Sequence, residues 1–275
     1  MSRSILITGC SSGIGYTAAH ALRARGWHVV AACRKPHDVA RLQQEGFTAI
    51  TLDYADPVSV QSGFEDAIEI AGGRLDAVFN NGGHGMPGAA EDLPRAALEE
   101  VFQSNVFGVH DLTRRAVALM RAQGGGRIVQ HSSVVGFTPL KWRAAYVATK
   151  HALEGLNNTM RIELRGSGIH LSILNTGPVT SGFRDNSARQ FDRWIDVDAS
   201  VHEDFYRSTF TRRRGPDSKP DLFELPASAV VQKLVHALES PYPRRRYYIT
   251  TPAYIAAILT RVLPEAATDW IISKF

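Results

Sequence analysis

A short apolar stretch that runs directly into a glycine-rich turn constrains the fold of this chain most. Ile5–Ile7 has the pattern of a buried parallel strand, Thr8–Gly15 contains three glycines, and a helical pattern continues from Tyr16 to Arg25. Glycines let a backbone approach phosphate groups, and a helix N-terminus favours their negative charge. The spacing G-x-x-x-G-x-G differs from the better known G-x-G-x-x-G. A glycine-rich stretch before a helix can also be no more than a tight turn, without a ligand. Its position after the first strand favours a dinucleotide-binding site.

The rest of the chain continues the alternation of strands and helices. Further strands are predicted at Trp27–Cys33, Phe47–Leu52, Ala77–Phe79, Arg127–Gln130, Ile169–Leu174 and Arg246–Thr250. Helices are predicted at Val58–Ile70, Pro94–Arg121, Tyr146–Arg165 and Ser228–Glu239, with a loop at Val134–Ala144. This alternation indicates an α/β protein with a doubly wound parallel sheet, the Rossmann fold. The length of 275 residues suits a single domain over residues 1–275.

Composition excludes several classes of protein. With 31 basic and 27 acidic side chains, the net charge of +4 is too small to indicate a nucleic-acid-binding arm. Cys10 and Cys33 offer neither a disulfide framework nor a metal-ligand spacing, so no metal site is expected. Neither a signal-peptide pattern nor an apolar run of about 18 residues occurs. We therefore expect a cytoplasmic protein without a nucleic-acid partner.

The end of the second predicted strand indicates which dinucleotide binds. Ligands of doubly wound sheets lie beyond the carboxyl ends of the strands, where an acid accepts a ribose 2′-hydroxyl and a basic residue accommodates a 2′-phosphate. The chain has Arg34 and Lys35 there and no acid before Asp38. Ser11 and Ser12 could add hydroxyl donors. Although Arg34 could be a solvated surface arginine, its distance from the glycine turn favours NADP(H) over NAD(H).

A tyrosine and a lysine, Tyr146 and Lys150, lie four residues apart on one predicted helical face. A free phenol has a pKa near ~10, and a nearby ammonium lowers that value. The pair therefore predicts a general acid/base that moves a proton to or from an oxygen.

These features together resemble the short-chain dehydrogenase/reductase family over essentially the whole chain. The resemblance depends on Thr8-Gly9-x-x-x-Gly13-Ile14-Gly15, Asp53, Asn80-Asn81-x-Gly83, Asn105, Ser133, Tyr146-x-x-x-Lys150 and Gly177-Pro178-Val179. The separation between Ser133 and Tyr146, 146 − 133 = 13, is also usual in the family. Only this spacing distinguishes Ser133 from the adjacent Ser132.

The resemblance implies a role for each matched residue. Tyr146 would exchange a proton with the substrate oxygen, Ser133 would hydrogen-bond the same oxygen, Lys150 would lower the pKa of Tyr146 and hold the nicotinamide ribose, and Asn105 would position a relay water. Asp53 would contact adenine, and Asn80 would lie near the adenine-side ribose and the sheet centre. The implied catalytic residues are Asn105, Ser133, Tyr146 and Lys150. The implied cofactor-binding residues are Gly9, Ser11, Ser12, Gly13, Ile14, Gly15, Arg34, Lys35, Asp53, Asn80, Tyr146, Lys150, Val179 and Ser181.

Two positions depart from the family pattern. Gly82 stands where alanine is usual, which we expect to loosen the local backbone. Asn175-Thr176 replaces a proline-bearing pair before Gly177. Both could change cofactor affinity without touching the catalytic groups.

Apolar loop residues indicate the substrate class. In the family, loops at these positions line the pocket, and here they carry Val134, Val135, Phe137, Leu140, Trp142 and Phe183. They suggest an apolar aldehyde, ketone or alcohol, although about half could only pack the loops. Within the family the chain resembles 17β-hydroxysteroid and retinol dehydrogenases and bacterial NADP-dependent aldehyde reductases. An NADP(H) cofactor favours the reductive direction.

Two segments near the C-terminus have less regular patterns. The irregular segment 185–226 is predicted to be a substrate lid, with a surface loop as the alternative. The apolar extension 253–275 is expected to pack on the subunit or at a dimer interface, or else to touch a membrane surface beside Arg244–Arg246. The resemblance implies a homodimer or homotetramer.

Three rival functions remain open. A cofactor-binding sensor or scaffold without turnover would usually lack the tyrosine or the lysine, yet both are present. An enoyl reductase commonly has a longer tyrosine-to-lysine spacing. A sugar or polyol dehydrogenase fits the motifs but not the apolar loops.

Overall fold

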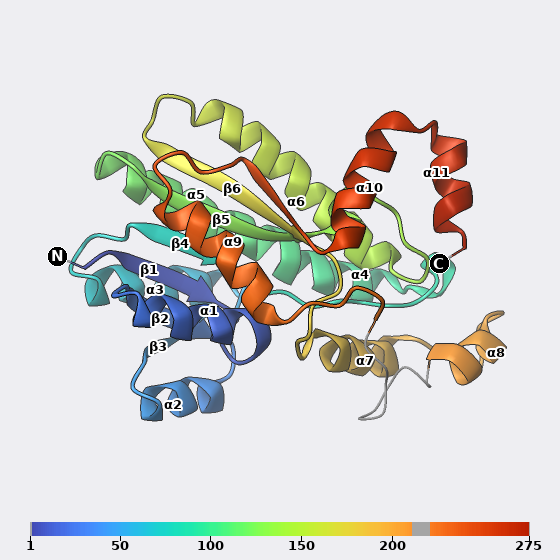
Figure 1. The fold of residues 1–275 in the computed structure, drawn as a ribbon. Helices are drawn as coiled ribbons and strands as arrows, with labels where there is room; N and C mark the ends of the chain where they lie inside the picture. Colours follow the sequence, from blue (N-terminus) through green and yellow to red (C-terminus); the bar gives the residue numbers. More distant parts are fainter. Residues whose placement is uncertain (1, 211–220, 275) are drawn as a thin grey trace.

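A computed structural model describes residues 2–210 and 221–274 and confirms the doubly wound sheet (Figure 1). Seven parallel strands lie in the order β3-β2-β1-β4-β5-β6-β7. The strands are β1 Ser4–Thr8, β2 His28–Cys33, β3 Thr48–Thr51, β4 Ala77–Asn80, β5 Gly126–Ser133, β6 Ile169–Thr176 and β7 Arg246–Ile249. Every strand of the described sheet overlaps a strand predicted from the sequence.

The central strand β1 explains why apolar runs predict this sheet. All five of its residues are buried, and it pairs with β2 on one side and β4 on the other. A parallel strand covered on both faces has no solvent-facing side, so its sequence is continuously apolar and does not alternate.

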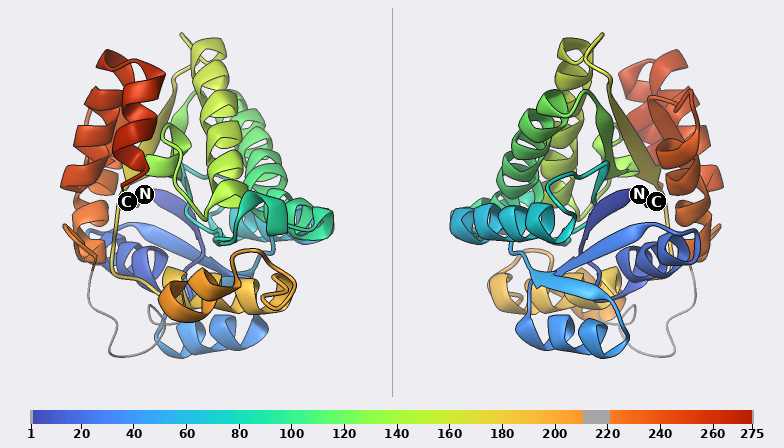
Figure 2. Two further views of the ribbon diagram at one scale, coloured as in Figure 1. Left: turned by 90° about the vertical axis from the view of Figure 1, so that its right-hand side faces the viewer. Right: turned by 90° about the vertical axis from the view of Figure 1, so that its left-hand side faces the viewer.

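Helices cover both faces of the sheet (Figure 2). On one face, the core contains side chains of α1 Gly13–Ala24, α2 Pro36–Gln44 and α9 Ala227–Glu239. On the other, it contains side chains of α3 Pro57–Ile70, α5 Gly108–Ala122 and α6 Ala144–Glu163. The sequence analysis missed α2, because only Val39 and Leu42 of this short helix are buried.

The predicted helix Pro94–Arg121 is interrupted. It consists of α4 Arg95–Phe102, the π-helical turn η2 Gln103–Phe107 and α5. Gly108 follows the turn, and a Cβ there would lie 2.0 Å from the carbonyl oxygen of Tyr54. The wider turn therefore accompanies a close backbone approach, and π-turns of this kind frequently mark functional sites. Asn105 lies inside it.

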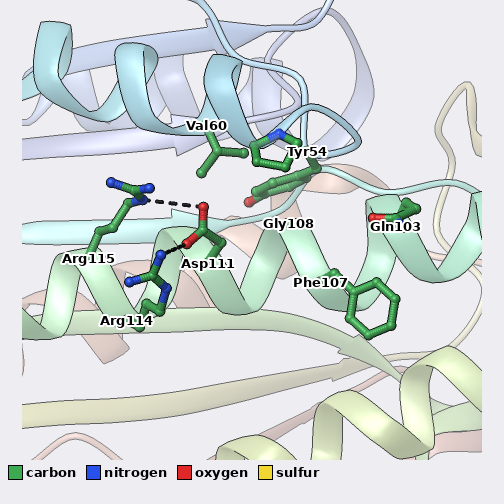
Figure 3. A pocket seen from close by; sticks show the side chains of 9 residues that line it. Tyr54, Val60, Gln103, Phe107, Gly108, Asp111, Arg114 and Arg115 are labelled. Carbon is green, nitrogen blue, oxygen red and sulfur yellow. Dashed lines mark hydrogen bonds and ion pairs between the residues drawn. The ribbon is translucent and has the colours of Figure 1, made fainter.

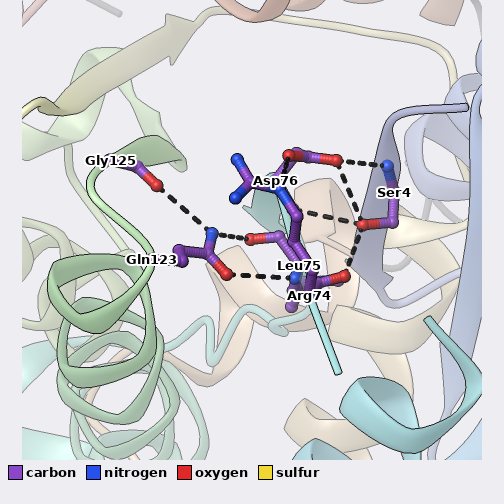
Figure 4. Close-up of polar contacts among 6 residues, drawn as sticks. All are labelled: Ser4, Arg74, Leu75, Asp76, Gln123 and Gly125. Atoms are coloured by element: carbon purple, nitrogen blue, oxygen red, sulfur yellow. Dashed lines mark hydrogen bonds and ion pairs between the residues drawn. The ribbon is translucent and has the colours of Figure 1, made fainter. Parts of the chain in front are cut away.

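Polar contacts connect neighbouring segments at the amino edge of the sheet, opposite the predicted site (Figure 4). The backbone N–H of Ser4 donates to Asp76 Oδ2 over 2.9 Å, and Gln123 Nε2 donates to the carbonyl oxygen of Leu75 over 2.7 Å. These contacts tie together the starts of β1 and β4 and the end of α5.

The segment 185–226 is more regular than the sequence analysis expected. Its described part contains most of α7 Phe183–Trp194, then α8 Glu203–Phe205 and the π-helical turn η4 Tyr206–Phe210. The helix was missed because it is strongly polar, with only Ser187 and Phe191 buried. Residues 211–220 of the predicted lid lie outside the described residues.

The remaining elements are short turns and the C-terminal extension. The turn η1 Ala90–Asp92 precedes α4, and η3 Val134–Gly136 begins the predicted loop after β5. The extension forms α10 Thr251–Val262 and α11 Glu265–Ile272. Among the residues the structure describes, no helix has both the length and the apolar character needed to cross a membrane.

Candidate active site

The glycine-rich turn between β1 and α1 has the geometry of a phosphate cradle. Gly9 and Gly13 have positive φ values of 68° and 56°. A Cβ at Gly15 would lie 2.3 Å from the carbonyl oxygen of Gly9. Only glycines therefore permit this tight turn and its close packing against the first turn of α1, as in turns that bind a pyrophosphate. The first turn of α1 carries no acidic residue, so the N-terminal end of its dipole is not neutralised there. These residues fit a dinucleotide.

The loop after β6 lies against this turn. A Cβ at Gly13 would lie 2.8 Å from Cβ of Ser181, and one at Gly182 would lie 3.4 Å from Oγ of Ser12. Val179 forms a bridge with Leu225. The structure thus brings together Ser12, Gly13 and Ser181, which the sequence analysis assigned to one cofactor from distant parts of the chain.

Arg34 and Lys35 follow β2 at the same edge, and both are exposed. Within residues 2–210 and 221–274, no carboxylate forms an ion pair with either. Arg41 on α2 was not predicted from the sequence. Its Nη2 donates to the carbonyl oxygen of Ser11 over 2.6 Å, and its Nη1 pairs with Glu45 over 2.8 Å. Only the tertiary structure shows that this arginine fixes the glycine-rich turn.

Asn80 lies at the sheet centre, as predicted. Its side chain is buried, its Oδ1 accepts from the Tyr54 hydroxyl over 2.7 Å, and its Nδ2 donates to Thr113 Oγ1 over 3.0 Å. Both groups of this side chain therefore stabilise the sheet, and its place near the ribose stays a prediction. Asp53 is only partly buried, and its Oδ1 accepts from the Ala55 N–H over 3.0 Å.

Gly82 is held tightly, contrary to the expected loosening. Its N–H and that of Asn81 each donate to Thr8 Oγ1 over 3.0 Å. A Cβ at Gly82 would lie 2.9 Å from Cε2 of Tyr54. The glycine therefore makes room for the Tyr54 ring.

The predicted catalytic residues meet above the ends of β5 and β6. Ser133 ends β5, and its Oγ donates to the carbonyl oxygen of Thr176 over 3.2 Å. Tyr146 and Lys150 lie on α6, and Lys150 Nζ donates to the carbonyl oxygen of His131 over 2.8 Å. The lysine nitrogen is 5.6 Å from the centre of the Tyr146 ring.

Asn105 joins this group from the π-turn. Its Nδ2 donates to the carbonyl oxygen of His84 over 2.8 Å and to Thr149 Oγ1 over 3.3 Å, while its Oδ1 accepts from the His84 N–H over 3.1 Å. The side chain thus ties the loop after β4 to the catalytic helix.

Burial dominates the electrostatics of the catalytic groups. It raises the pKa of Tyr146, and a hydrogen bond with Ser133 opposes that rise. It lowers the pKa of Lys150 to about 8, opposed by the charge of Glu154. Desolvation thus acts against the expected lowering of the Tyr146 pKa, and the lowering by Lys150 stays a prediction. At neutral pH Tyr146 is a phenol, which can donate a proton.

The apolar loop residues divide into two groups. Phe183 reaches the site, with its ring centre 5.2 Å from that of Tyr146. Trp142 instead stacks on Phe205 at 4.3 Å, and Val135 is buried. Phe137 packs edge-on against Tyr248 at 5.8 Å. These three contacts fit loop packing, the alternative left open above, and a pocket-lining role for these residues stays a prediction.

A surface hollow between α3 and α5 is separate from this group (Figure 3). It is lined by Tyr54, Pro57, Val60, Gln103, Phe107, Gly108, Asp111, Arg114 and Arg115. Asp111 pairs with both arginines, at 2.5 and 3.3 Å, so it compensates one of the two positive charges that face the hollow. None of the predicted catalytic residues lines it.

Comparison with known proteins identifies this arrangement. The family model described as short chain dehydrogenase matches residues 3–191. The chain belongs to the short-chain dehydrogenase/reductase family. It is an oxidoreductase of that family and works with a nicotinamide cofactor.

Individual relatives support this assignment over the full chain. An uncharacterized oxidoreductase of Escherichia coli, YbbO, is 39% identical over 99% of this chain and 94% of its own length. Human 17-beta-hydroxysteroid dehydrogenase type 1 is 28% identical over 98% of this chain and 84% of its own length. A crystal structure of a Burkholderia phymatum family member in complex with NAD has a TM-score of 0.78 and 26% identity, covering 95% of this chain and 92% of its own.

Proposed function

We propose that this short-chain dehydrogenase/reductase reduces apolar aldehydes or ketones to alcohols with NADPH and catalyses the reverse reaction with NADP⁺. One observation supports this proposal most directly. Ser133, Tyr146 and Lys150 lie together beyond the strand ends, at the edge of the sheet where the glycine-rich turn also lies. The reduced cofactor supplies the hydride when bound. The protein's own groups hold the carbonyl and supply the proton.

The raised pKa of Tyr146 supports the reductive direction. A phenol that stays protonated at neutral pH can protonate the oxygen of a carbonyl as it becomes an alkoxide. Ser133, whose hydroxyl already interacts with Tyr146, would hydrogen-bond the same oxygen and stabilise its developing charge.

Arg34 and Lys35 support NADP(H). Both lie exposed at the end of β2, where a 2′-phosphate would need positive charge. Arg41 fixes the carbonyl of Ser11 nearby, which keeps the turn in one position. Asp38 contacts Arg41 at 3.7 Å, which offsets part of its negative charge near this site.

The aromatic surroundings of Tyr146 favour an apolar substrate over a sugar or polyol. Phe183 lies against Tyr146, and the cluster of Met86, Phe191, Ile195 and Tyr206 supports α7, the helix that begins with Phe183. A substrate with many hydroxyl groups would leave them without partners against such rings.

The test is a series of linear aldehydes from four to ten carbons, with glyceraldehyde and xylose as polar comparisons. The proposal expects kcat/KM with NADPH to rise with chain length by roughly threefold per buried methylene. Higher kcat/KM for the sugars would favour the polyol alternative. Tight NADPH binding without turnover of any compound would favour the sensor or scaffold.

We also propose a homodimer or homotetramer. Phe107, at the end of η2, and Ile162 on α6 are 54% and 62% exposed, which suits apolar surfaces covered by a second copy. The C-terminal helices expose Ile258, Val262 and Trp270, and they could join that interface or touch a membrane surface. Light scattering with and without phospholipid vesicles distinguishes these two uses.

A further inference from the structure

Three polar side chains outside the family motifs meet beside the catalytic helix. They are Glu154 on α6, Asn175 near the end of β6 and Arg246 at the start of β7. Arg246 donates through Nη2 to Glu154 Oε2 over 2.6 Å and through Nη1 to Asn175 Oδ1 over 2.7 Å. Asn175 Nδ2 donates to Glu154 Oε1 over 2.6 Å, which closes the ring. We call these residues the Glu154–Asn175–Arg246 ring.

The ring holds the turn that carries Ser133. Asn175 Nδ2 also donates to the carbonyl oxygen of Ser133 over 3.0 Å. Gly136 lies in the turn after Ser133, and a Cβ there would lie 2.9 Å from Cγ of Glu154. The glycine therefore leaves space for the carboxylate under the turn. A buried ion pair adds little net stability, because desolvation offsets its attraction. The position of this ion pair beside the catalytic groups suggests that it has a role other than stabilising the fold.

Glu154 also lies one helical turn beyond Lys150, on the same face of α6. The titratable and charged groups around Lys150 are Tyr146 and Glu154 on α6, His131 on β5 and, through Glu154, Arg246 on β7. Burial and the Lys150 charge lower the pKa of His131 to about 3, so its ring is neutral. Among these groups of the described chain, Glu154 supplies the negative charge that favours the Lys150 ammonium.

We propose that the Glu154–Asn175–Arg246 ring positions Ser133 and keeps Lys150 in its ammonium form during the reaction. Glu154 and Asn175 are then positioning residues, and this inference rests on the proposed function. The sequence analysis recorded Asn175 only as a departure from the family pattern. In the structure that departure supplies the amide that joins Ser133 to Glu154.

The first experiment follows the titration of Lys150 by NMR of the lysine Nζ and Cε signals, assigned with Lys150→Arg. Glu154→Gln keeps the shape of the side chain and removes its charge, so the pKa of Lys150, about 8 in the native chain, should fall by roughly one unit. Arg246→Gln is the matched control. It breaks the same ring but leaves the carboxylate, so the pKa of Lys150 should not fall. Glu154→Asp should retain most of the native titration.

The second experiment compares steady-state kinetics. Asn175→Ala should lower kcat about tenfold and leave NADPH affinity within twofold, because it releases Ser133. The Lys150 titration should stay unchanged, because the Glu154 carboxylate keeps its charge and its bond to Arg246. In Glu154→Gln, the basic limb of the pH profile of kcat should move to lower pH with the Lys150 titration.

If the pKa of Lys150 were the same in the native chain and in Glu154→Gln, the proposed role of Glu154 would be overturned. Native kcat in Asn175→Ala would overturn the role of Asn175. If the native chain reduced no carbonyl compound, the proposed function would fail, yet the NMR titration would still decide whether Glu154 sustains the ammonium. Should Glu154→Gln not fold, the double variant Glu154→Gln/Arg246→Gln removes both charges of the ion pair and takes its place. The pKa of Lys150 should fall in it relative to Arg246→Gln alone.

Discussion

The cofactor side of the site and its substrate side are held together in different ways. Around the glycine-rich turn the close approaches are between backbones, as at Gly15 and Gly9. On the substrate side, aromatic rings make the contacts: Trp142 stacks on Phe205, and the Tyr206 hydroxyl donates to Asp92 over 2.6 Å. Backbone approaches require particular residues at fixed spacings, whereas aromatic packing tolerates exchange. We infer that short sequence motifs determine the chemistry, whereas tertiary packing determines which substrate is chosen.

The largest expected effect comes from the group that both sides share. Tyr146→Phe removes the hydroxyl but keeps the ring against Phe183, so kcat should fall by at least about a thousandfold while NADPH affinity changes less than threefold. Stopped-flow turnover and fluorescence titration of NADPH measure the two quantities. Tyr248→Phe, outside the catalytic group, serves as the matched control. Strong residual turnover in Tyr146→Phe would remove Tyr146 from its assigned role.

The next effect should be confined to the cofactor side. Arg34→Asp replaces a phosphate-binding charge with a 2′-hydroxyl acceptor, so the ratio of kcat/KM for NADPH over NADH should fall by about a hundredfold. The aldehyde chain-length preference should not change. Arg121→Asp makes the same charge change on the last turn of α5, at the opposite edge of the sheet, and should leave the ratio unaltered. An unchanged ratio in Arg34→Asp would identify Arg34 as a solvated surface residue.

A third change should act on the substrate side alone. Phe205→Ala removes a ring that packs against the cluster supporting α7 and its Phe183, so KM for a ten-carbon aldehyde should rise about five- to tenfold. NADPH affinity should stay native, because this cluster includes no residue of the glycine-rich turn. Tyr242→Ala, at a side chain that is 87% exposed, is the control. A parallel loss of NADPH affinity would contradict the separation of the two sides.

The smallest effect tests the packing under the cofactor side. Gly82→Ala places a Cβ 2.9 Å from the Tyr54 ring, so the free energy of unfolding should fall by about 1–3 kcal/mol. Tyr54→Val should also destabilise, because it removes hydrogen bonds to Thr8 and Asn80. The double variant should lose less free energy of unfolding than the sum of the losses in the two single variants, and urea unfolding measures this difference. Additive losses would mean that Gly82 and Tyr54 are not coupled.

The sequence predicted the parts of the molecule that depend on local rules. Buried parallel strands, the glycine-rich turn and the pair Tyr146 and Lys150 each have a pattern within a few neighbouring residues. The seven-stranded sheet confirms the fold, and the structure gathers Ser133, Tyr146, Lys150 and Asn105 as the motif order implied.

The remaining features depend on contacts between distant segments. The π-turn at Asn105 accompanies the approach of Gly108 to Tyr54, which no helical period predicts. The pKa of Tyr146 is set by burial, which depends on the whole fold. The sequence predicted that Asn80 lies at the sheet centre, but its partners Tyr54 and Thr113 come from other segments and needed the structure. Glu154, Asn175 and Arg246 belong to three elements that the sequence separates.

Deuteride transfer tests the central claim most directly. NADPH carrying one deuterium at C4 of the nicotinamide, prepared separately for each face, is incubated with the chain and decanal, and the alcohol is examined by mass spectrometry. The account predicts decanol with one deuterium on its carbinol carbon from one of the two cofactors and none from the other. Decanol without deuterium from either cofactor, or no decanol at all, would contradict reduction of an apolar carbonyl by NADPH at this site.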